Sequence, residues 1–366
     1  MQQEAPESLR RVAPVDAGDL LISKSKFLSG LQCSKLLWHH YRAKHLIPEP
    51  DAAQQSIFDQ GHEVGELAKQ LFSDGIEVAD GVQDFDDILQ RSQDLLGSRR
   101  PLFEAAFTFN GGYARADILN PIGDDAWDIV EVKSSTEVKD VNLLDLAFQA
   151  FVYTGAGLII RRCILMHVNR DFVRHGPVDP RQFFRQTDLT AQVSGLSRHI
   201  EDYLDDMFGV LRRPDHPVIK IGPHCNAPYA CPLMDHCWSF LPETSVMDLY
   251  RSGRKGWRLL DEGILAIRDI PGHIDLTERQ AIQRKVTRAG KPHVDRKALA
   301  AFLNRLQFPV GYLDFETFGT AIPLFDGLKP YQPVPFQFSL HRQELPGGPL
   351  SHHGFLANGS HDPRLA

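Results

Sequence analysis

The chain has 366 residues and a formal net charge of −7, from 40 basic and 47 acidic residues. This length exceeds what one ordinary hydrophobic core accommodates, so two domains are expected. With 42% hydrophobic and 24% charged residues, the composition is typical of a soluble globular protein rather than a disordered one. The acidic balance argues against a general nucleic-acid coat protein, but it is compatible with a nuclease, because a metal site needs carboxylates.

The sequence predicts a cytoplasmic protein without a membrane partner. Its polar start, MQQEAPESLRR, has no apolar segment of the kind found in secretory signals. No apolar run approaches the roughly 18 residues that span a bilayer.

The first part of the chain favours helices after a flexible tail over residues 1–20. Ser23 is a candidate N-cap, and apolar residues recur at helical spacing in each segment that follows it. The predicted helices are Lys24–Tyr41, Ala52–Phe72 and Phe85–Leu96.

The pattern then changes to short β-rich runs. PLFEAAFTF, GYARADIL and WDIVEVKSS are separated by turn residues and predict an antiparallel meander. A helix over Asn142–Tyr153 and the apolar strand LIIRRCILMHV, predicted to be central, come next. An amphipathic helix over Leu189–Leu211 precedes a cysteine-rich loop.

The meander places two carboxylates and a lysine together. Glu131 and Lys133 are two apart on one predicted strand and therefore share a face, and a hairpin brings Asp117 beside Glu131. Paired carboxylates, with the carbonyl of Val132, suit Mg²⁺ or Mn²⁺, which prefer oxygen ligands. The ammonium group of Lys133 is then placed to orient a water or help to deprotonate it. The pattern is short, and an ordinary strand with exposed Glu and Lys is the alternative.

Three further segments accompany this pattern in order. GHEVG contains His62, a strand with the sequence EAAF begins at Glu104, and FQAFVY places Gln149 and Tyr153 on one helix face. Taken singly, His62 could be an exposed helix histidine, Gln149 and Tyr153 could be surface and packing residues, and Glu104 could face solvent.

In combination, these segments resemble the RecB-type branch of the PD-(D/E)xK nuclease superfamily, which includes CRISPR-associated adaptation nucleases and the AddB helicase-nuclease. The resemblance covers about residues 20–240. It implies an α/β fold of the restriction-endonuclease-like type, a mixed sheet flanked by helices. It also implies that His62 is a metal ligand and that Gln149 and Tyr153 contact substrate.

The activity implied is Mg²⁺- or Mn²⁺-dependent hydrolysis of DNA, on single strands or at ends, in repair or in defence against foreign DNA. The alternative is a nucleic-acid-binding scaffold whose nuclease centre is silent.

Two basic clusters are candidate phosphate tracks, although each could also be solvated helix surface. Their members are Arg251, Arg254, Lys255 and Arg258, and then Arg284, Lys285, Arg288, Lys291, Arg296 and Lys297.

Cysteines form a second pattern, because Cys225, Cys231 and Cys237 fall within thirteen residues. In iron–sulfur members of the RecB-type branch, one upstream cysteine joins three such residues to ligate a [4Fe–4S] cluster, and the resemblance assigns that part to Cys33. The first gap is longer here than the usual C-x2-C, so a Zn²⁺ site with His224 or His236 replacing Cys33 is the alternative. Cys163 lies in the apolar strand and is predicted to be a core residue.

The C-terminal part begins with YLDFET, which places Asp314 and Glu316 on one face of a strand. This resembles the first motif of ribonuclease-H-like DEDD-type exonucleases, where such a pair holds divalent metal. The order of the two parts resembles an uncharacterised bacterial family of two-nuclease proteins. Only about 60 residues follow, fewer than such a domain needs, so we expect a truncated or vestigial site. The predicted domains are 21–245, a helical linker over 246–306, and 307–366.

Overall fold

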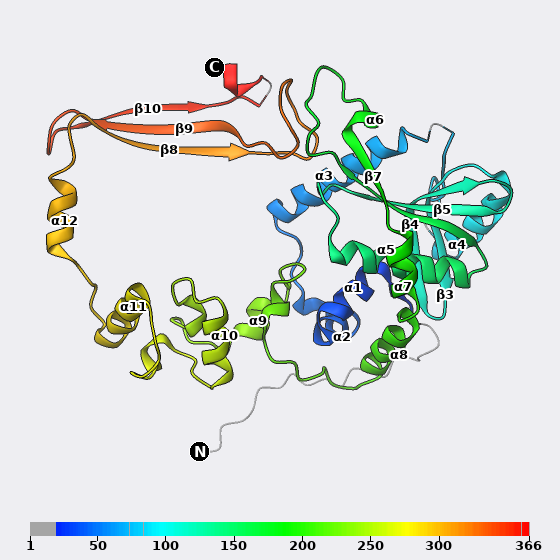
Figure 1. The fold of residues 1–366 in the computed structure, drawn as a ribbon, viewed down its shortest axis with the longest axis horizontal. Helices are drawn as coiled ribbons and strands as arrows, with labels where there is room; N and C mark the ends of the chain where they lie inside the picture. Colours follow the sequence, from blue (N-terminus) through cyan, green and yellow to red (C-terminus); the bar gives the residue numbers. More distant parts are fainter. Residues whose placement is uncertain (1–19, 73, 83, 360, 366) are drawn as a thin grey trace. The chain divides into compact units, whose positions relative to one another are not determined.

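A computed structural model describes residues 20–72, 74–82, 84–359 and 361–365. It is a mixed α/β structure with a mixed sheet flanked by helices (Figure 1). The predicted tail lies, apart from Leu20, outside the described residues. The chain divides into two compact units. The first comprises the described part of Met1–Ile219 and Gly319–Pro333, and the second comprises Lys220–Phe318 and Val334–Ala366.

A seven-stranded sheet forms the centre of the first unit. Its strand order is β2-β3-β4-β5-β6-β7, and β1 pairs with β4. Neighbours β3, β4 and β5 are antiparallel, which confirms the predicted meander, whereas β5 and β6 are parallel. The strands are β1 (Ile22–Ser23), β2 (Ile76–Glu77), β3 (Leu102–Phe109), β4 (Gly112–Ile122), β5 (Ala126–Lys133), β6 (Ile159–Val168) and β7 (Phe184–Asp188).

Helices cover both faces of this sheet, with α3 on one side and α1, α5 and α7 on the other (Figure 1). Each face has its own buried apolar cluster, one containing Val64 of α3 and the other containing Phe148 of α5. The helices are α1 (Lys24–Gln32), α2 (Ser34–Arg42), α3 (Ala52–Lys69), α4 (Phe85–Leu95), α5 (Asp140–Gly155), α6 (Pro180–Phe183), α7 (Thr190–Ser197) and α8 (Ile200–Leu211). Short 3₁₀ turns occupy Lys44–Leu46 and Leu96–Ser98.

Two helices predicted as continuous are interrupted, which corrects the sequence prediction. Cys33 adopts an extended backbone, φ −161° and ψ 118°, and separates α1 from α2. The second interruption lies between α7, which ends at Ser197, and α8, which begins at Ile200. Apolar periodicity continues through both breaks, so the sequence pattern does not reveal them. At Gly30 of α1 a Cβ would lie 2.7 Å from the terminal methyl of Met207 of α8, so the two helices pack closely there.

The side-chain alternation of β3 breaks at Glu104, which has a φ of +59°. Leu102 and Ala105 belong to the apolar cluster on the α5 side, whereas Phe103 belongs to the cluster on the α3 side. A regular strand would keep residues 103 and 105 on one face. On β4 the same change occurs at Asp117, because Ala116 faces α5 and Ile118 faces α3.

The second unit contains short helices followed by a three-stranded antiparallel sheet of order β10-β9-β8. The predicted strand that carries Asp314 and Glu316 is β8, which pairs with β9, and β10 pairs with the other edge of β9. A small buried apolar cluster contains Val246, Leu249, Leu259 of α10, Ile267 and Ile270. The elements are 3₁₀ turns at Pro223–Cys225, Val246–Asp248, Ile267–Asp269 and Pro363–Leu365, α9 (Met234–Trp238), α10 (Arg254–Asp261), α11 (Glu278–Ala289), α12 (Arg296–Leu303), β8 (Val310–Phe318), β9 (Val334–Gln343) and β10 (Leu350–Leu356). None of the helices in the described ranges combines the length and the apolar character needed to cross a membrane.

Candidate active site

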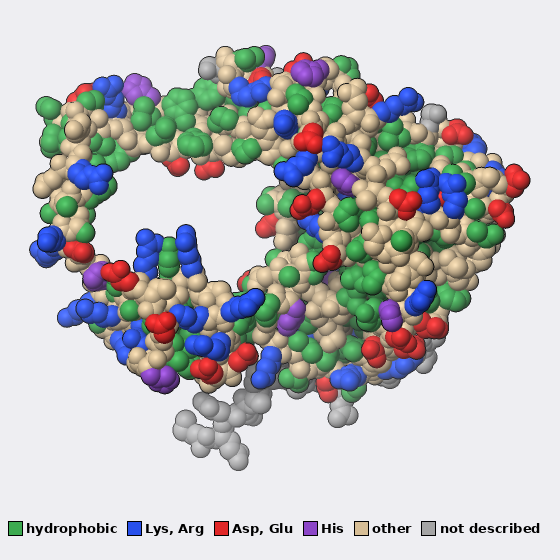
Figure 2. Space-filling view, in the orientation of Figure 1, with side chains coloured by type: hydrophobic (Ala, Val, Ile, Leu, Met, Phe, Trp, Pro, Cys, Tyr) green, Lys and Arg blue, Asp and Glu red, His purple; other side chains and the backbone are tan. Residues whose placement is uncertain are grey.

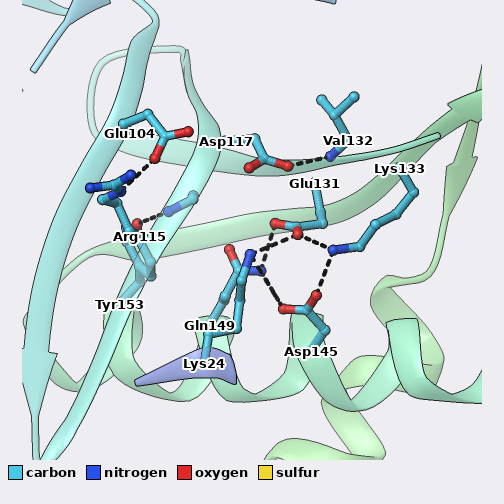
Figure 3. Close-up of polar contacts among 11 residues, drawn as sticks. Lys24, Glu104, Arg115, Asp117, Glu131, Val132, Lys133, Asp145, Gln149 and Tyr153 are labelled. Carbon is cyan, nitrogen blue, oxygen red and sulfur yellow. Dashed lines mark hydrogen bonds and ion pairs between the residues drawn. The ribbon is translucent and has the colours of Figure 1, made fainter. Parts of the chain in front are cut away.

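A buried ionic network joins β5 to α5 and α1 (Figure 3). Lys133 Nζ lies 2.5 Å from Glu131 Oε1 and 2.8 Å from Asp145 Oδ2. From the start of α1, Lys24 Nζ lies 2.7 Å from Glu131 Oε1. The amide of Gln149 donates to Glu131 Oε2 at 2.8 Å and to Asp145 Oδ1 at 2.9 Å. The side chain of Glu131 is 1% exposed, so two ammonium groups and an amide replace its solvation.

Charge pairing keeps this network ionised. Burial alone would raise the pKa of Glu131, but the ammonium groups of Lys133 and Lys24 hold that pKa well below its usual range. Burial would likewise lower the pKa of Lys133, and the carboxylates of Glu131, Asp145 and Asp117 raise it well above its ordinary value instead. Lys133 therefore carries a proton at neutral pH, which suits it to orient a water or stabilise negative charge rather than to act as a base.

Asp117 lies on β4 beside this network. Its Oδ2 accepts a hydrogen bond of 2.7 Å from the backbone N–H of Val132 on β5. Burial, together with repulsion from Glu131, raises the pKa of Asp117 to about 7. Asp117 is half-buried and lines a cavity, and a carboxylate there with too little compensating positive charge is a site that an added cation would stabilise.

Tyr153 connects two strands at this level of the sheet. Its hydroxyl donates to Ala105 O of β3 at 2.5 Å and accepts from Ala116 N of β4 at 2.8 Å. The side chain is fully buried, and burial raises its pKa above the usual value. Tyr153 thus holds β3 and β4 together at the paired residues next to Glu104 and Asp117.

A cavity of about 500 Å³ opens on the α3 side of the sheet. Its lining includes His62 of α3, Asp117, Val132, and the ion pair between Glu104 and Arg115. Arg115 Nε lies 2.5 Å from Glu104 Oε2 (Figure 3). Regular alternation on β4 directs Arg115 and Asp117 to this side of the sheet, because the flanking Ala114 and Ala116 face α5.

The structure therefore brings the predicted residues to two neighbouring places. His62, Asp117 and Val132 line the cavity, whereas Glu131, Lys133 and Gln149 belong to the network on the α5 side. Within the described ranges, no three His, Cys, Asp or Glu side chains are close enough together to hold a metal ion.

Sequence reasoning missed Lys24, Asp145 and Arg115. For Asp145 a signal exists, since it precedes Gln149 by four residues and Tyr153 by eight and therefore shares their helix face. Arg115 also has a signal, because it lies two residues before Asp117 on the same predicted strand and so shares its face. Lys24 has none, because only the packing of α1 brings it to the site.

One atom of the network lacks a partner. Gln149 Oε1 is buried and accepts no hydrogen bond within the described part of the chain. The reverse orientation of this amide would place its oxygen against two carboxylates, so the present orientation is the favourable one. Because buried acceptors are normally satisfied, this oxygen suits a water that donates to it.

The cysteines lie in different units. Cys33 separates α1 from α2 in the first unit, while Cys225, Cys231 and Cys237 belong to the second. Within the second unit, Cys231 N donates to Cys225 O at 2.8 Å, which folds that loop back on itself. Cys163 is a buried core residue on β6, and burial raises the pKa of its thiol to about 12. The metal or cluster ligation of the other four stays a prediction.

Asp314 and Glu316 lie on β8 of the second unit. They pair with Ser339 and Gln337 of β9, and both are exposed. The predicted strand and the shared face are thus present, and a role in metal binding stays a prediction.

Comparisons with known proteins add little to this geometry. A sequence-family model described as "Domain of unknown function (DUF2779)" matches residues 311–366, which are in the C-terminal part of the chain. No curated protein matches the chain significantly. A solved structure described as "Crystal structure of SSO0001" is 14% identical, with 39% of this chain and 86% of that chain covered and a TM-score of 0.17. A score that low carries no argument about fold or activity.

Proposed function

We propose that this protein is a metal-dependent nuclease of the PD-(D/E)xK type, with its catalytic site on β4 and β5. The observation that carries the proposal is the ion-paired Lys133–Glu131 unit, held by Asp145 and Gln149, on the strand next to Asp117. Buried charges are costly unless they are paired and used. The finer fold assignment, a restriction-endonuclease-like sheet, belongs to the same proposal.

The donor types proposed, a histidine, two carboxylates and a backbone carbonyl, suit Mg²⁺ or Mn²⁺, although among the described residues these side chains are not gathered around one point. His62, the Asp117 carboxylate and the Val132 carbonyl belong to the cavity side, and Glu131 is the second carboxylate of the ligand set. When bound, the ion supplies charge stabilisation at the scissile phosphate and a more acidic water. To bind the metal, Glu131 would give up its contact with one of the two ammonium groups, that of Lys24 or that of Lys133.

The chain's own groups then act on water and substrate. Lys133 keeps its proton and orients the attacking water, Gln149 accepts a hydrogen bond from that water through Oε1, and Tyr153 fixes the distance between β3 and β4. The substrate proposed is DNA, single-stranded or at an end.

The strands of the second unit are proposed to belong to a ribonuclease-H-like fold, with Asp314 and Glu316 as two carboxylates of a metal site. The three cysteines of the second unit, with Cys33, are proposed to ligate a [4Fe–4S] cluster that stabilises the fold, with Zn²⁺ as the alternative.

A cleavage assay tests the activity. With Mn²⁺, the purified protein should degrade end-labelled single-stranded DNA, and Lys133→Ala should lower the rate at least about a hundredfold, the scale of losing one electrostatic stabiliser. Lys139→Ala, at an exposed lysine, is the matched control. Equal rates for Lys133→Ala and the unsubstituted protein, with both shown folded by thermal unfolding, would reject the assignment.

One observation favours a second candidate, a nucleic-acid-binding scaffold with a silent centre. Glu131 is already bound to two ammonium groups and does not line the cavity. Tight DNA binding without cleavage under Mg²⁺ and Mn²⁺ would support this candidate.

A further inference from the structure

The chain's charge is distributed unevenly. Residues 251–305 contain thirteen Lys and Arg but six Asp and Glu, a net of +7 within a chain whose net charge is −7. The remaining residues therefore carry a net charge of −14. Figure 2 shows Lys and Arg side chains gathered over α10 and α11 of the second unit. Such asymmetry is typical of a surface that binds a polyanion.

Three of these cations lie on one face of α11. Arg284, Lys285 and Arg288 line a hollow of about 520 Å³ together with Ala281 and Ala289. These positions follow helical spacing and so share one face. No acidic residue contributes to this lining.

Two of the three cations are held in place by backbone carbonyls. Arg284 Nη1 donates to Pro271 O at 2.7 Å, and Arg288 donates to Arg268 O and Ile270 O at 2.6 and 2.7 Å. Each guanidinium has five N–H donors, so both retain donors for a ligand. Immobilised donors lose less side-chain entropy when they bind.

The cluster also lacks counter-charge. Among the described residues, Arg284, Lys285 and Arg288 form no ion pair with a carboxylate, and Lys285 is exposed. Like charges four apart on a helix repel one another, as Arg284 and Arg288 do. An anion in the hollow would relieve that repulsion.

We propose that this face of α11, extended by Lys291, binds the phosphate backbone of a nucleic acid without reading its sequence. The proposal deepens the nuclease assignment, since the choice of nucleic acid as the polyanion rests on it. A membrane surface fits less well, because the described residues of α11 include no large exposed hydrophobic side chain that could enter a bilayer.

Salt-dependent binding tests this proposal. We would measure the anisotropy of labelled single-stranded DNA with the full chain, in buffer free of divalent metal so that no cleavage occurs. The double variant Lys285→Gln with Lys291→Gln should reduce the slope of log K against log salt by about 1.4, at about 0.7 per lost phosphate contact. Both lysines are exposed, and neither holds the backbone, so the fold should be unaffected.

Two control variants make the test specific. Lys44→Gln with Arg212→Gln removes the same charge from exposed positions of the first unit and should leave the slope unchanged. Lys285→Arg with Lys291→Arg keeps the charge and should retain the slope. Equal slopes for the original protein and the α11 variant, or an equal loss in the first-unit variant, would overturn the proposal.

Two further measurements distinguish a failure of this proposal from a failure of the nuclease assignment. Lys133→Ala protein should bind DNA with the unaltered slope, so loss of cleavage with retained binding concerns only the catalytic site. Vesicles of anionic phospholipid are the competing ligand. Stronger binding to these vesicles than to DNA, lost in the α11 variant, would overturn the choice of nucleic acid.

Discussion

At the scale of single residues, Lys133 depends on its neighbours for its position. Asp145 accepts from its ammonium at 2.8 Å, and Gln149 bridges Asp145 to Glu131. Removing a residue that orients a catalytic or ligating group commonly lowers activity or metal affinity by about tenfold to a hundredfold. Asp145 is therefore a positioning residue, which contacts Lys133 and Gln149 rather than substrate.

Asp145→Asn should lower kcat by roughly tenfold to a hundredfold and leave KM nearly unchanged, because the substituted side chain touches no substrate. Steady-state cleavage of labelled DNA measures both constants. Asp140→Asn, at an exposed position in the first turn of the same helix, is the control. A rise in KM with an unaltered kcat would contradict a positioning role.

A second residue-scale prediction concerns His40. Burial and the nearby charge of Lys26 lower its pKa to about 4, and Lys26 Nζ lies 2.9 Å from His40 Nδ1. Between pH 6.5 and 4 the unfolded chain binds a proton at this ring that the folded chain does not. The free energy of unfolding should therefore fall as the pH falls through this window.

Urea unfolding at pH 7.5 and pH 5 measures the effect. His40→Gln keeps an acceptor for Lys26 without the titration, so the fall between the two pH values should become smaller. His45→Gln, at an exposed position, should leave the fall as it was. An undiminished fall in His40→Gln would show that other groups cause it.

At the scale of elements, the irregularity shared by β3 and β4 shapes the site. Glu104, at a φ of +59°, lies between the paired positions Phe103–Ile118 and Ala105–Ala116. Non-glycine residues with such a φ cost of order 1 kcal/mol and persist where the surroundings require them. Here the irregularity places both Phe103 and Glu104 on the α3 side, so that Glu104 lines the cavity, and the Tyr153 hydroxyl bonds to both strands.

In urea unfolding, the free energy of unfolding of Glu104→Gly should exceed that of Glu104→Ala by about 1 kcal/mol, because glycine adopts a positive φ without strain. Both variants lose the ion pair with Arg115, so their difference reports the backbone alone. At Thr108, a later position of the same strand, alanine should instead be the more stable substitution. If alanine were the more stable substitution at Glu104 as well as at Thr108, Glu104 would not be strained.

At the scale of the whole molecule, cysteines far apart in the sequence are proposed to share one cluster. Protein purified without oxygen should be brown, absorb near about 400 nm and contain iron rather than zinc. Cys231→Ser should lose the iron, whereas Cys163→Ser should keep it, since Cys163 is a buried core residue. Colourless protein with stoichiometric zinc would contradict the iron–sulfur cluster and support the zinc site.

The sequence by itself predicted the meander of β3, β4 and β5, the helix carrying Gln149 and Tyr153, and the placement of Asp117 beside Glu131. These depend on the alternation and helical periods of neighbouring residues, which are local properties. Tertiary structure decided the remainder. It separated the residues lining the cavity from the Glu131–Lys133 network, and it brought Lys24 and Asp145 to that network. It also broke two helices at Cys33 and after Ser197. Such outcomes depend on packing between distant segments and on backbone strain at one residue, which no local pattern records.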